Sequence, residues 1–379
     1  MKNCKLLFEM NYTEKFNRKI KKKIKFINKH MVYTMNINGT FSGDHIFEII
    51  SVVNYIRKAY RQKIPIVIFL GEFEFYDKLV YIILESIVYY LNVIDGHKID
   101  VRFKAKHTIW TEGIRYSSLV NQSMLLNRYK YDLNMYHFRK LIPERNGRKD
   151  EYLSNLLQDI YGFLYNNGIE DVTCEKLSEV IIELVGNAGE HGDSECLLDI
   201  DITQSEYGKR DEEGIFYGVN VVILNCSSTL FFEPLKEKLS SDIKLSERYN
   251  DVLRAREYHF AHLNDNYKED DFYTISSFQH KISGSRLKDQ LGGTGLTSLL
   301  RSLEEDSDTH LCYMLSGRRI LFFEKEHMMY DDNEYVGFNK NKDFFSDIPD
   351  TNVFDTINTF WPGVAYNLNY AVKKETNYE

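Results

Sequence analysis

The sequence predicts an α/β protein (α+β in the wider sense) built from two successive units, and three observations support this. Between residues 31 and 110, segments typical of strands alternate with segments of helical periodicity. A polar stretch, PERNGRKDE, then marks a boundary, with the linker placed at residues 143–150. Beyond it, a helix closed by Gly168 and a second amphipathic helix open a longer unit, residues 151–372. With 379 residues, 43% of them hydrophobic, the chain can bury the core that two units need.

Residues 1–30 form a basic N-terminal segment. Within EKFNRKIKKKIKFINKH, apolar residues recur at helical intervals at Phe16, Ile20, Ile24 and Ile27, which predicts a basic amphipathic helix. We interpret its lysines as the solvated face of a surface helix, with contact to an anionic membrane surface or to nucleic acid as the alternative. The formal net charge of −8 opposes non-specific nucleic-acid binding by the whole protein.

Residues 31–142 are predicted to form a small α/β unit with a helical extension. MVYTMNING, IPIVIFLG and KIDVRFKA have the length and composition of strands, and HIFEIISVVNYIRKAYRQ and DKLVYIILESIVYYLN those of helices. Strand and helix therefore alternate, as in α/β folds. Over roughly residues 31–110 this pattern resembles the STAS domain, in which a strand leads through a short turn into a helix.

The turn departs from the STAS pattern. Regulatory STAS domains are phosphorylated there on a serine or threonine, whereas this sequence reads EFEFYDKLVY, with Asp77 and Lys78 and no hydroxyl other than tyrosine. We therefore expect a docking or structural role for this turn rather than a phosphorylation switch.

The second unit contains a helix with a polar edge. It begins near Thr173, a suitable N-cap, and one face is apolar, with Leu177, Val180, Ile181, Leu184, Val185 and Ala188. Glu183, Asn187 and the pair Glu190–His191 are three to four residues apart, so they share a neighbouring face. A carboxylate and an amide at this spacing can orient a water and complete the oxygen shell of a magnesium ion. A partly exposed helix edge is the alternative.

A glycine-rich turn precedes a later helix. In DQLGGTGLTSLLRSL, Gly292, Gly293 and Gly295 stand directly before an apolar stripe that starts at Leu296. Glycines at a helix N-terminus let backbone amides approach phosphate oxygens, whose charge the helix dipole favours. The alternative is a tight connection, because the turn lacks both the lysine of a P-loop and a βαβ dinucleotide fingerprint.

Taken in order, these motifs resemble those of the GHKL (Bergerat-fold) ATPases, which include histidine kinases and gyrase. ELVGNAGEHG matches the asparagine box in its histidine-kinase and anti-sigma-factor-kinase form, and GGTGLTSLL matches the last glycine box. THLCYMLSGRRILFFE resembles the strand pair that follows, and FWPGVAYNLNY the closing strand. The resemblance implies a two-layer sandwich, with helices on one face of a mixed, largely antiparallel sheet.

The resemblance also implies roles for individual residues. Glu183 would be the general base that activates water, and Asn187 would coordinate magnesium. His191 would approach the phosphates, with a plain role at the helix C-terminus as the alternative. The residues around the phosphates would be Gly292, Gly293, Thr294, Gly295 and Leu296.

The first glycine box departs from the family. Its strand usually ends in Asp-x-Gly-x-Gly, whose aspartate accepts a hydrogen bond from the adenine amine. Here Asn225 takes the aspartate position, and Ser227 and Thr229 replace glycines. Asparagine can still accept that bond, so adenine is expected, with guanine or weak nucleotide binding as alternatives.

Residues 227–291 are predicted to form a long, polar, largely helical insert in the place of the ATP lid. Its basic residues would either contact the phosphates or face solvent: Lys281, Arg286 and Lys288.

These features predict a protein that binds ATP and Mg²⁺ and hydrolyses ATP slowly. Its nucleotide state would switch an interaction with a protein partner, or within a homodimer, in a regulatory or defence system. Two alternatives are a serine/threonine kinase of the anti-sigma-factor type and a non-catalytic nucleotide-binding scaffold. His137 lies six residues before a proline, as in a phosphoacceptor box, but Phe138 replaces the acidic neighbour, so we interpret the match as chance.

The remaining features concern location and cysteine chemistry. The five cysteines are scattered without a CxxC pair, which predicts neither a disulfide framework nor a zinc site. No apolar run is long enough to span a membrane, and the N-terminus does not have the pattern of a signal peptide. A cytoplasmic protein is therefore expected.

Overall fold

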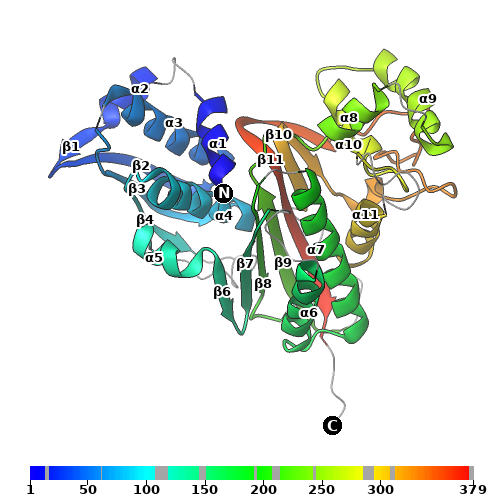
Figure 1. The fold of residues 1–379 in the computed structure, drawn as a ribbon, viewed down its shortest axis with the longest axis horizontal. Helices are drawn as coiled ribbons and strands as arrows, with labels where there is room; N and C mark the ends of the chain where they lie inside the picture. The colour runs from blue at the N-terminus through cyan, green and yellow to red at the C-terminus, as the bar shows by residue number, and fades with distance from the viewer. Residues whose placement is uncertain are drawn as a thin grey trace, which may run out of the picture.

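The structure is a computed structural model that describes residues 1–12, 17–60, 62–106, 118–144, 151–191, 194–206, 214–241, 245–284, 294–307 and 312–374. The side chains of residues 17–19, 190 and 191 are not included in that description. Two β-sheets, here sheet A and sheet B, have helices between them and on the far side of sheet B (Figure 1). None of the described helices is long and apolar enough to cross a bilayer.

Sheet A contains the predicted alternation of strands and helices. Its strand order is β1-β2-β3-β4-β5, where the strands are β1 (Lys25–Ile27), β2 (His30–Phe41), β3 (Ile66–Phe75), β4 (Ile99–Lys106) and β5 (Leu119–Val120). β2, β3 and β4 are parallel, whereas β1 and β5 are antiparallel to their neighbours. Parallel neighbours need crossover connections. The crossovers are α3 (Gly43–Ala59) and α4 (Lys78–Tyr89), the latter followed by the π-helix η2 (Tyr90–Asp95). The predicted α/β arrangement is confirmed.

The basic segment is less helical than predicted. The short helices η1 (Lys2–Cys4) and α1 (Lys5–Met10) come first, and α2 (Asn17–Lys23) then ends before Ile24. Asn28 and Lys29 both have positive φ and connect β1 to β2, which are the conditions for a two-residue hairpin turn. The prediction of a helix through Ile27 is therefore wrong, because this hairpin places Ile27 on a strand. The lysines at the end of α2 are exposed.

Sheet B has the order β10-β11-β9-β8-β7-β6, and every described pair is antiparallel. Its strands are β6 (Tyr131–Asn134), β7 (His137–Ile142), β8 (Cys196–Ile202), β9 (Phe216–Asn225), β10 (Tyr313–Phe322) and β11 (Phe354–Lys373). The mixed sheet is thus sheet A. Residues 313–322 form one strand instead of the expected pair, with register shifts on both sides of Gly317.

Sheet B also begins earlier in the chain than expected. β6 and β7 lie within residues 31–142, the predicted first unit, but β7 pairs with β8 from His137 to Ile142. The two sheets are connected by α5 (Gln122–Arg128), before the predicted linker at 143–150. The sheet boundary therefore falls ahead of β6.

Helices cover one face of sheet B with an apolar core. This layer comprises α6 (Tyr152–Tyr165), α7 (Asp171–His191) and α11 (Gly295–Asp306). Between β9 and α11, the predicted insert contains α8 (Glu233–Leu239), α9 (Glu247–Ala261) and α10 (Glu269–Ser276). The short helix η5 (Lys325–His327) follows β10. Every apolar position predicted on α7, from Leu177 to Ala188, is buried.

α4 lies between the two sheets (Figure 1), and all twelve of its residues are buried. Its neighbours include Leu197, Val222 and Leu224, which point from sheet B into the core that α4 shares with sheet A. A helix with apolar residues on all sides must be covered on every side, and its few charged residues, Lys78 and Glu85, are paired. The result is a stack of four layers: sheet A, the α3–α4 layer, sheet B and the α6–α7–α11 layer.

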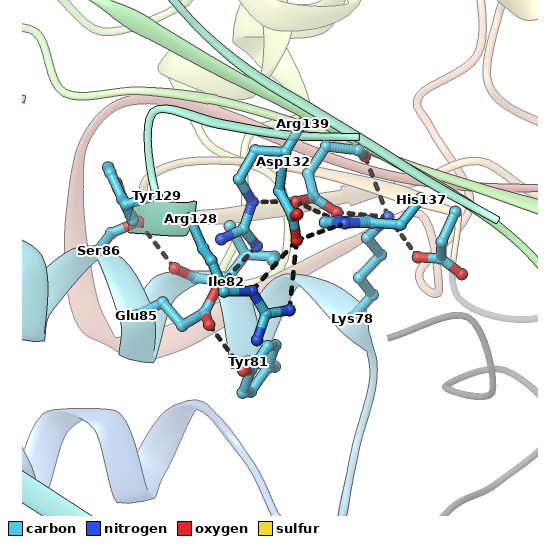
Figure 2. Close-up of polar contacts among 12 residues, drawn as sticks. Lys78, Tyr81, Ile82, Glu85, Ser86, Arg128, Tyr129, Asp132, His137 and Arg139 are labelled. Atoms are coloured by element: carbon cyan, nitrogen blue, oxygen red, sulfur yellow. Dashed lines mark hydrogen bonds and ion pairs between the residues drawn. The ribbon is translucent and has the colours of Figure 1, made fainter. Parts of the chain in front are cut away.

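Polar side chains dock the start of α4 onto sheet B (Figure 2). The Nζ of Lys78 lies 2.8 Å from Asp199 Oδ1, forms an ion pair with Asp201, and donates to the backbone oxygens of Asp199 and Asn220 at 3.1 and 3.0 Å. These carboxylates belong to β8. Of the docking or structural role expected for this turn, the structure shows a structural one for Lys78, which joins α4 to sheet B.

Arg139 and His137, both on β7, extend this arrangement. The guanidinium of Arg139 pairs with Asp199 and lies 2.7 Å from Glu85 on α4. His137 Nε2 is 3.0 Å from Asp199 Oδ2. We call Lys78, Glu85, His137, Arg139, Asp199 and Asp201 the docking cluster. All six side chains are buried, so His137 lies in a strand core, not on the exposed helix that a phosphoacceptor requires.

Ion pairing outweighs the effect of burial on the pKa of two members of the docking cluster, Asp199 and His137. Burial alone would raise the pKa of Asp199, but Arg139 and Lys78 outweigh it and hold that pKa well below its usual range. Burial alone would lower the pKa of His137, but Asp199 and Asp132 reverse the effect and raise it. Two layers of the fold are thus connected by paired charges without access to water.

Asp77 supports α4 in a different way, and this gives a first prediction. Its side chain caps the helix by accepting from Val80 N at 2.9 Å, and it accepts from the Tyr313 hydroxyl at 2.7 Å. Burial raises the pKa of Asp77 to about 6, against the opposing effect of these hydrogen bonds. Because the folded pKa lies above the unfolded one, ionised Asp77 reduces stability above pH 6, and this cost disappears as the pH falls towards 4.

The variant Asp77→Asn is therefore expected to be more stable than the wild type at pH 8. The gain in free energy of unfolding should be roughly 2–3 kcal/mol, since asparagine keeps the capping oxygen and carries no charge. Urea denaturation at pH 8 and at pH 4.5 measures the difference, which should shrink at the lower pH. A loss of stability at pH 8 would show that the two donors stabilise the ionised carboxylate more than burial destabilises it.

Candidate functional site

A cavity of about 850 Å³, including its open mouth, brings the two sequence motifs together. We call it the candidate pocket. Glu183 and Asn187 line it from α7, Asn225 from the end of β9, and Gly295 and Leu296 from the start of α11. Much of the remaining wall is apolar and includes Leu230, Phe231, Pro234, Leu235 and Ile282. A polar end and an apolar wall in one cavity are typical of a small-molecule site.

Glu183 and Asn187 are available for a ligand. They lie one turn apart on α7, Glu183 exposed and Asn187 half-buried. Within the described residues, neither side chain has a hydrogen bond or ion pair. Polar side chains that face a cavity without a protein partner can give all their donors and acceptors to a ligand or to water. The polar edge predicted on this helix is thus open towards the candidate pocket.

The start of α11 lies directly against Glu183. A Cβ on Gly295 would be 2.6 Å from Glu183 Oε2 and 3.0 Å from Glu183 Cβ, so this close approach depends on glycine. Thr294 is the N-cap of α11 but makes no side-chain capping bond. The first amides of a helix have no partners within it, and they attract anions. The structure therefore places a carboxylate, an amide and a helix N-terminus around one space.

Three predicted phosphate contacts fall outside the described part of the structure. Gly292 and Gly293 are not among the described residues, nor is the side chain of His191, although the backbone of His191 ends α7. Thr294, Gly295 and Leu296 are described, and Gly295 and Leu296 line the candidate pocket.

Asn225 connects elements of the pocket wall through hydrogen bonds. Its amide nitrogen donates to Ala188 O on α7 at 3.1 Å, and its side-chain oxygen accepts from Val364 N on β11 at 2.9 Å. Gly363 has φ of +93°, and a Cβ there would lie 2.7 Å from Asn225 Oδ1. The residue expected to read the base therefore connects three elements through its carboxamide. One amide hydrogen and one lone pair are left for other partners.

The insert is attached to the pocket by residues that the sequence did not single out. Lys238 on α8 is buried and donates to the Tyr249 hydroxyl at 2.9 Å and to Ser283 O at 3.1 Å. Ser283 lines the candidate pocket. A single lysine in a polar helix gives no sequence signal of burial, because its partners lie on other elements. Of the predicted lid cations, Lys281 is exposed and absent from the described pocket wall, while Arg286 and Lys288 lie outside the described residues.

Comparison with known proteins adds no relative. No family model matches the chain, and neither the curated proteins nor the solved structures contain a significant match.

Proposed function

We propose that this protein binds ATP with Mg²⁺ in the candidate pocket and hydrolyses it slowly, as the GHKL resemblance implies. The observation that carries the proposal is the convergence of Glu183, Asn187 and the N-terminus of α11 on one cavity. Glu183 and Asn187 lie on α7, far from α11 in the sequence, and each of the three has the chemistry that one part of a triphosphate site requires.

In this proposal each part of the ligand meets a different wall. The apolar side chains around Leu230 and Phe231 cover the base, and the free amides at the start of α11 face the phosphates. The side-chain oxygen of Asn187 would hold magnesium, which neutralises phosphate charge when bound. Glu183 accepts a proton from the attacking water.

The insert supplies the switch in this proposal. Leu235 on α8 and Ser283 beyond α10 line the candidate pocket, so a bound nucleotide contacts the insert directly. Loss of the γ-phosphate would change those contacts and alter the outer surface of the insert for a protein partner or a second copy.

Thermal unfolding with nucleotides tests the binding step. Saturating ATP–Mg²⁺ at about 100 times Kd should stabilise the wild type by about 2.7 kcal/mol. Asn187→Ala should lose the magnesium-dependent part of that shift, because it removes the proposed ligand oxygen. Asn155→Ala, on the exposed side of α6, is the matched control and should keep the full shift.

Thermal unfolding, combined with a turnover assay using radiolabelled ATP, separates the outcomes. No shift with ATP or GTP would overturn the proposal. A shift without phosphate release, under conditions of single turnover, would retain binding but replace the ATPase with a scaffold. Transfer of the γ-phosphate of radiolabelled ATP to a co-expressed protein would indicate a kinase.

A further inference from the structure

A second group of titratable side chains lies outside the candidate pocket, where β10 ends in η5. Glu324, Glu326 and His327 each offer one ligand atom, and these atoms lie within 4.8 Å of one another. The imidazole of His327 is 1% exposed, whereas the two glutamates are 39% and 59% exposed at their side chains. A buried imidazole nitrogen that could coordinate a metal therefore lies close to two carboxylates that ions in the solvent can reach.

The contacts of His327 differ from those of a histidine with satisfied hydrogen bonds. Neither ring nitrogen makes a hydrogen bond to any of the described residues, although both are buried. Three carboxylates nevertheless surround the ring: Nδ1 is 3.4 Å from Glu324 Oε2, and Nε2 is 3.0 Å from Asp350 Oδ2 and 3.9 Å from Glu326 Oε1. Metal bonds of about 2.0–2.1 Å place neighbouring tetrahedral ligands roughly 3.3–3.4 Å apart, which is the Nδ1–Glu324 separation.

We propose that His327, Glu324 and Glu326 form a binding site for one divalent transition-metal ion, with Nδ1 as the nitrogen ligand and Asp350 as the positioning residue. Of the two ring nitrogens, Glu326 lies nearer Nε2, and its side chain, 59% exposed, would turn its carboxylate towards the ion at Nδ1. Asp350 would accept from Nε2–H and so fix the tautomer that leaves Nδ1 free for the ion. Asn352 already donates to Glu324 Oε2 at 2.6 Å and orients that carboxylate. Water would complete the coordination.

The donor set selects the class of metal. One imidazole with two carboxylates suits Zn²⁺ and its neighbours in the transition series, whereas Mg²⁺ prefers oxygen ligands alone. Lys340 is the competing cation, because its Nζ lies 3.6 Å from Glu326 Oε2. Its side chain is 66% exposed, so it can move aside at little cost.

The ion would fasten a long connection that supports the insert. The segment between η5 and β11 holds the insert through Arg248, which donates to Asn333 O and Glu334 O at 2.9 Å, and through Gln279, which donates to Val336 O at 2.9 Å. Asp350 lies near the end of that segment and His327 near its beginning. Metal binding would therefore hold both ends of the segment in one place.

Zinc titration of the full chain, stripped of metal with EDTA, tests the proposal. Calorimetry should show one Zn²⁺ per chain, and Co²⁺ should give the visible absorption of a site with low coordination number. His327→Gln should weaken Zn²⁺ binding by roughly 100-fold or more, and Asp350→Asn by roughly 10-fold. His262→Gln, at an exposed histidine on the insert, is the matched control and should bind as the wild type does.

Two further variants and a competition with Mg²⁺ complete the experiment. If His327→Gln fails to fold, Glu326→Gln at an exposed position provides the ligand loss in its place. Asn187→Ala should bind Zn²⁺ normally, which separates this site from the candidate pocket, and excess Mg²⁺ should not compete. Absence of stoichiometric Zn²⁺ binding, or equal binding by the wild type and His327→Gln, would overturn the proposal.

Discussion

Replacing Glu183 with glutamine is expected to slow ATP hydrolysis by about 10²–10⁴-fold while nucleotide affinity stays equal to or tighter than that of the wild type. Glutamine has the same shape, so the contact between this side chain and Gly295 is retained. Its amide cannot accept a proton from water at neutral pH, and the loss of a negative charge favours the phosphates. Phosphate release in a single turnover measures the rate, and thermal shift measures binding.

The neighbouring turn of α7 provides the control for this experiment. Glu179 is exposed, lies one turn before Glu183, and is absent from the described wall of the candidate pocket. Glu179→Gln should hydrolyse ATP at the wild-type rate. Wild-type hydrolysis by Glu183→Gln would show that another group accepts the proton, whereas equal losses in both variants would indicate a general effect on the helix.

Replacing Lys78 with methionine is expected to lower the free energy of unfolding by about 3–5 kcal/mol. Methionine fills similar space, so the main change is the loss of the ammonium group that faces Asp199 and Asp201. Both carboxylates are buried, and Asp199 would keep Arg139 while Asp201 would lose its ion pair. Urea denaturation followed by circular dichroism measures the loss.

An exposed ion pair on the same strand as Arg139 is the matched comparison. Lys140 Nζ lies 2.9 Å from Asp159, and these side chains are 25% and 52% exposed. Lys140→Met should change stability by no more than about 1 kcal/mol, because water already solvates both charges. A loss below 1 kcal/mol for Lys78→Met as well would mean that the docking cluster does not hold α4 against sheet B.

Local patterns in the sequence predicted the elements that depend on periodicity. The alternation of apolar strands and helices between residues 31 and 106 produced sheet A as expected, because each parallel strand needs a crossover helix. The apolar stripe of α7 was also predictable, since residues three and four apart share a face. The polar edge at Glu183 and Asn187 follows from the same geometry.

Features that depend on distant partners were not predictable. HFRKLI could belong to either sheet, and its place in sheet B is decided by pairing with β8, more than fifty residues later in the chain. Arg139 is buried only because Asp199 and Glu85 neutralise it from two other elements. Likewise, the carboxamide of Asn225 is held by the backbones of Ala188 and Val364, which the order of the motifs does not reveal.

The position of β11 has a consequence for how the chain folds during translation. β11 lies between β9 and β10 although it follows both in sequence. Until the ribosome has released residues 354–373, β9 and β10 each present an unpaired edge, and such edges can pair with other nascent chains. A ribosome that stalls before residue 354 would therefore leave a polypeptide that contains β1 to β10 but has no continuous sheet B, which makes it a natural client for chaperones.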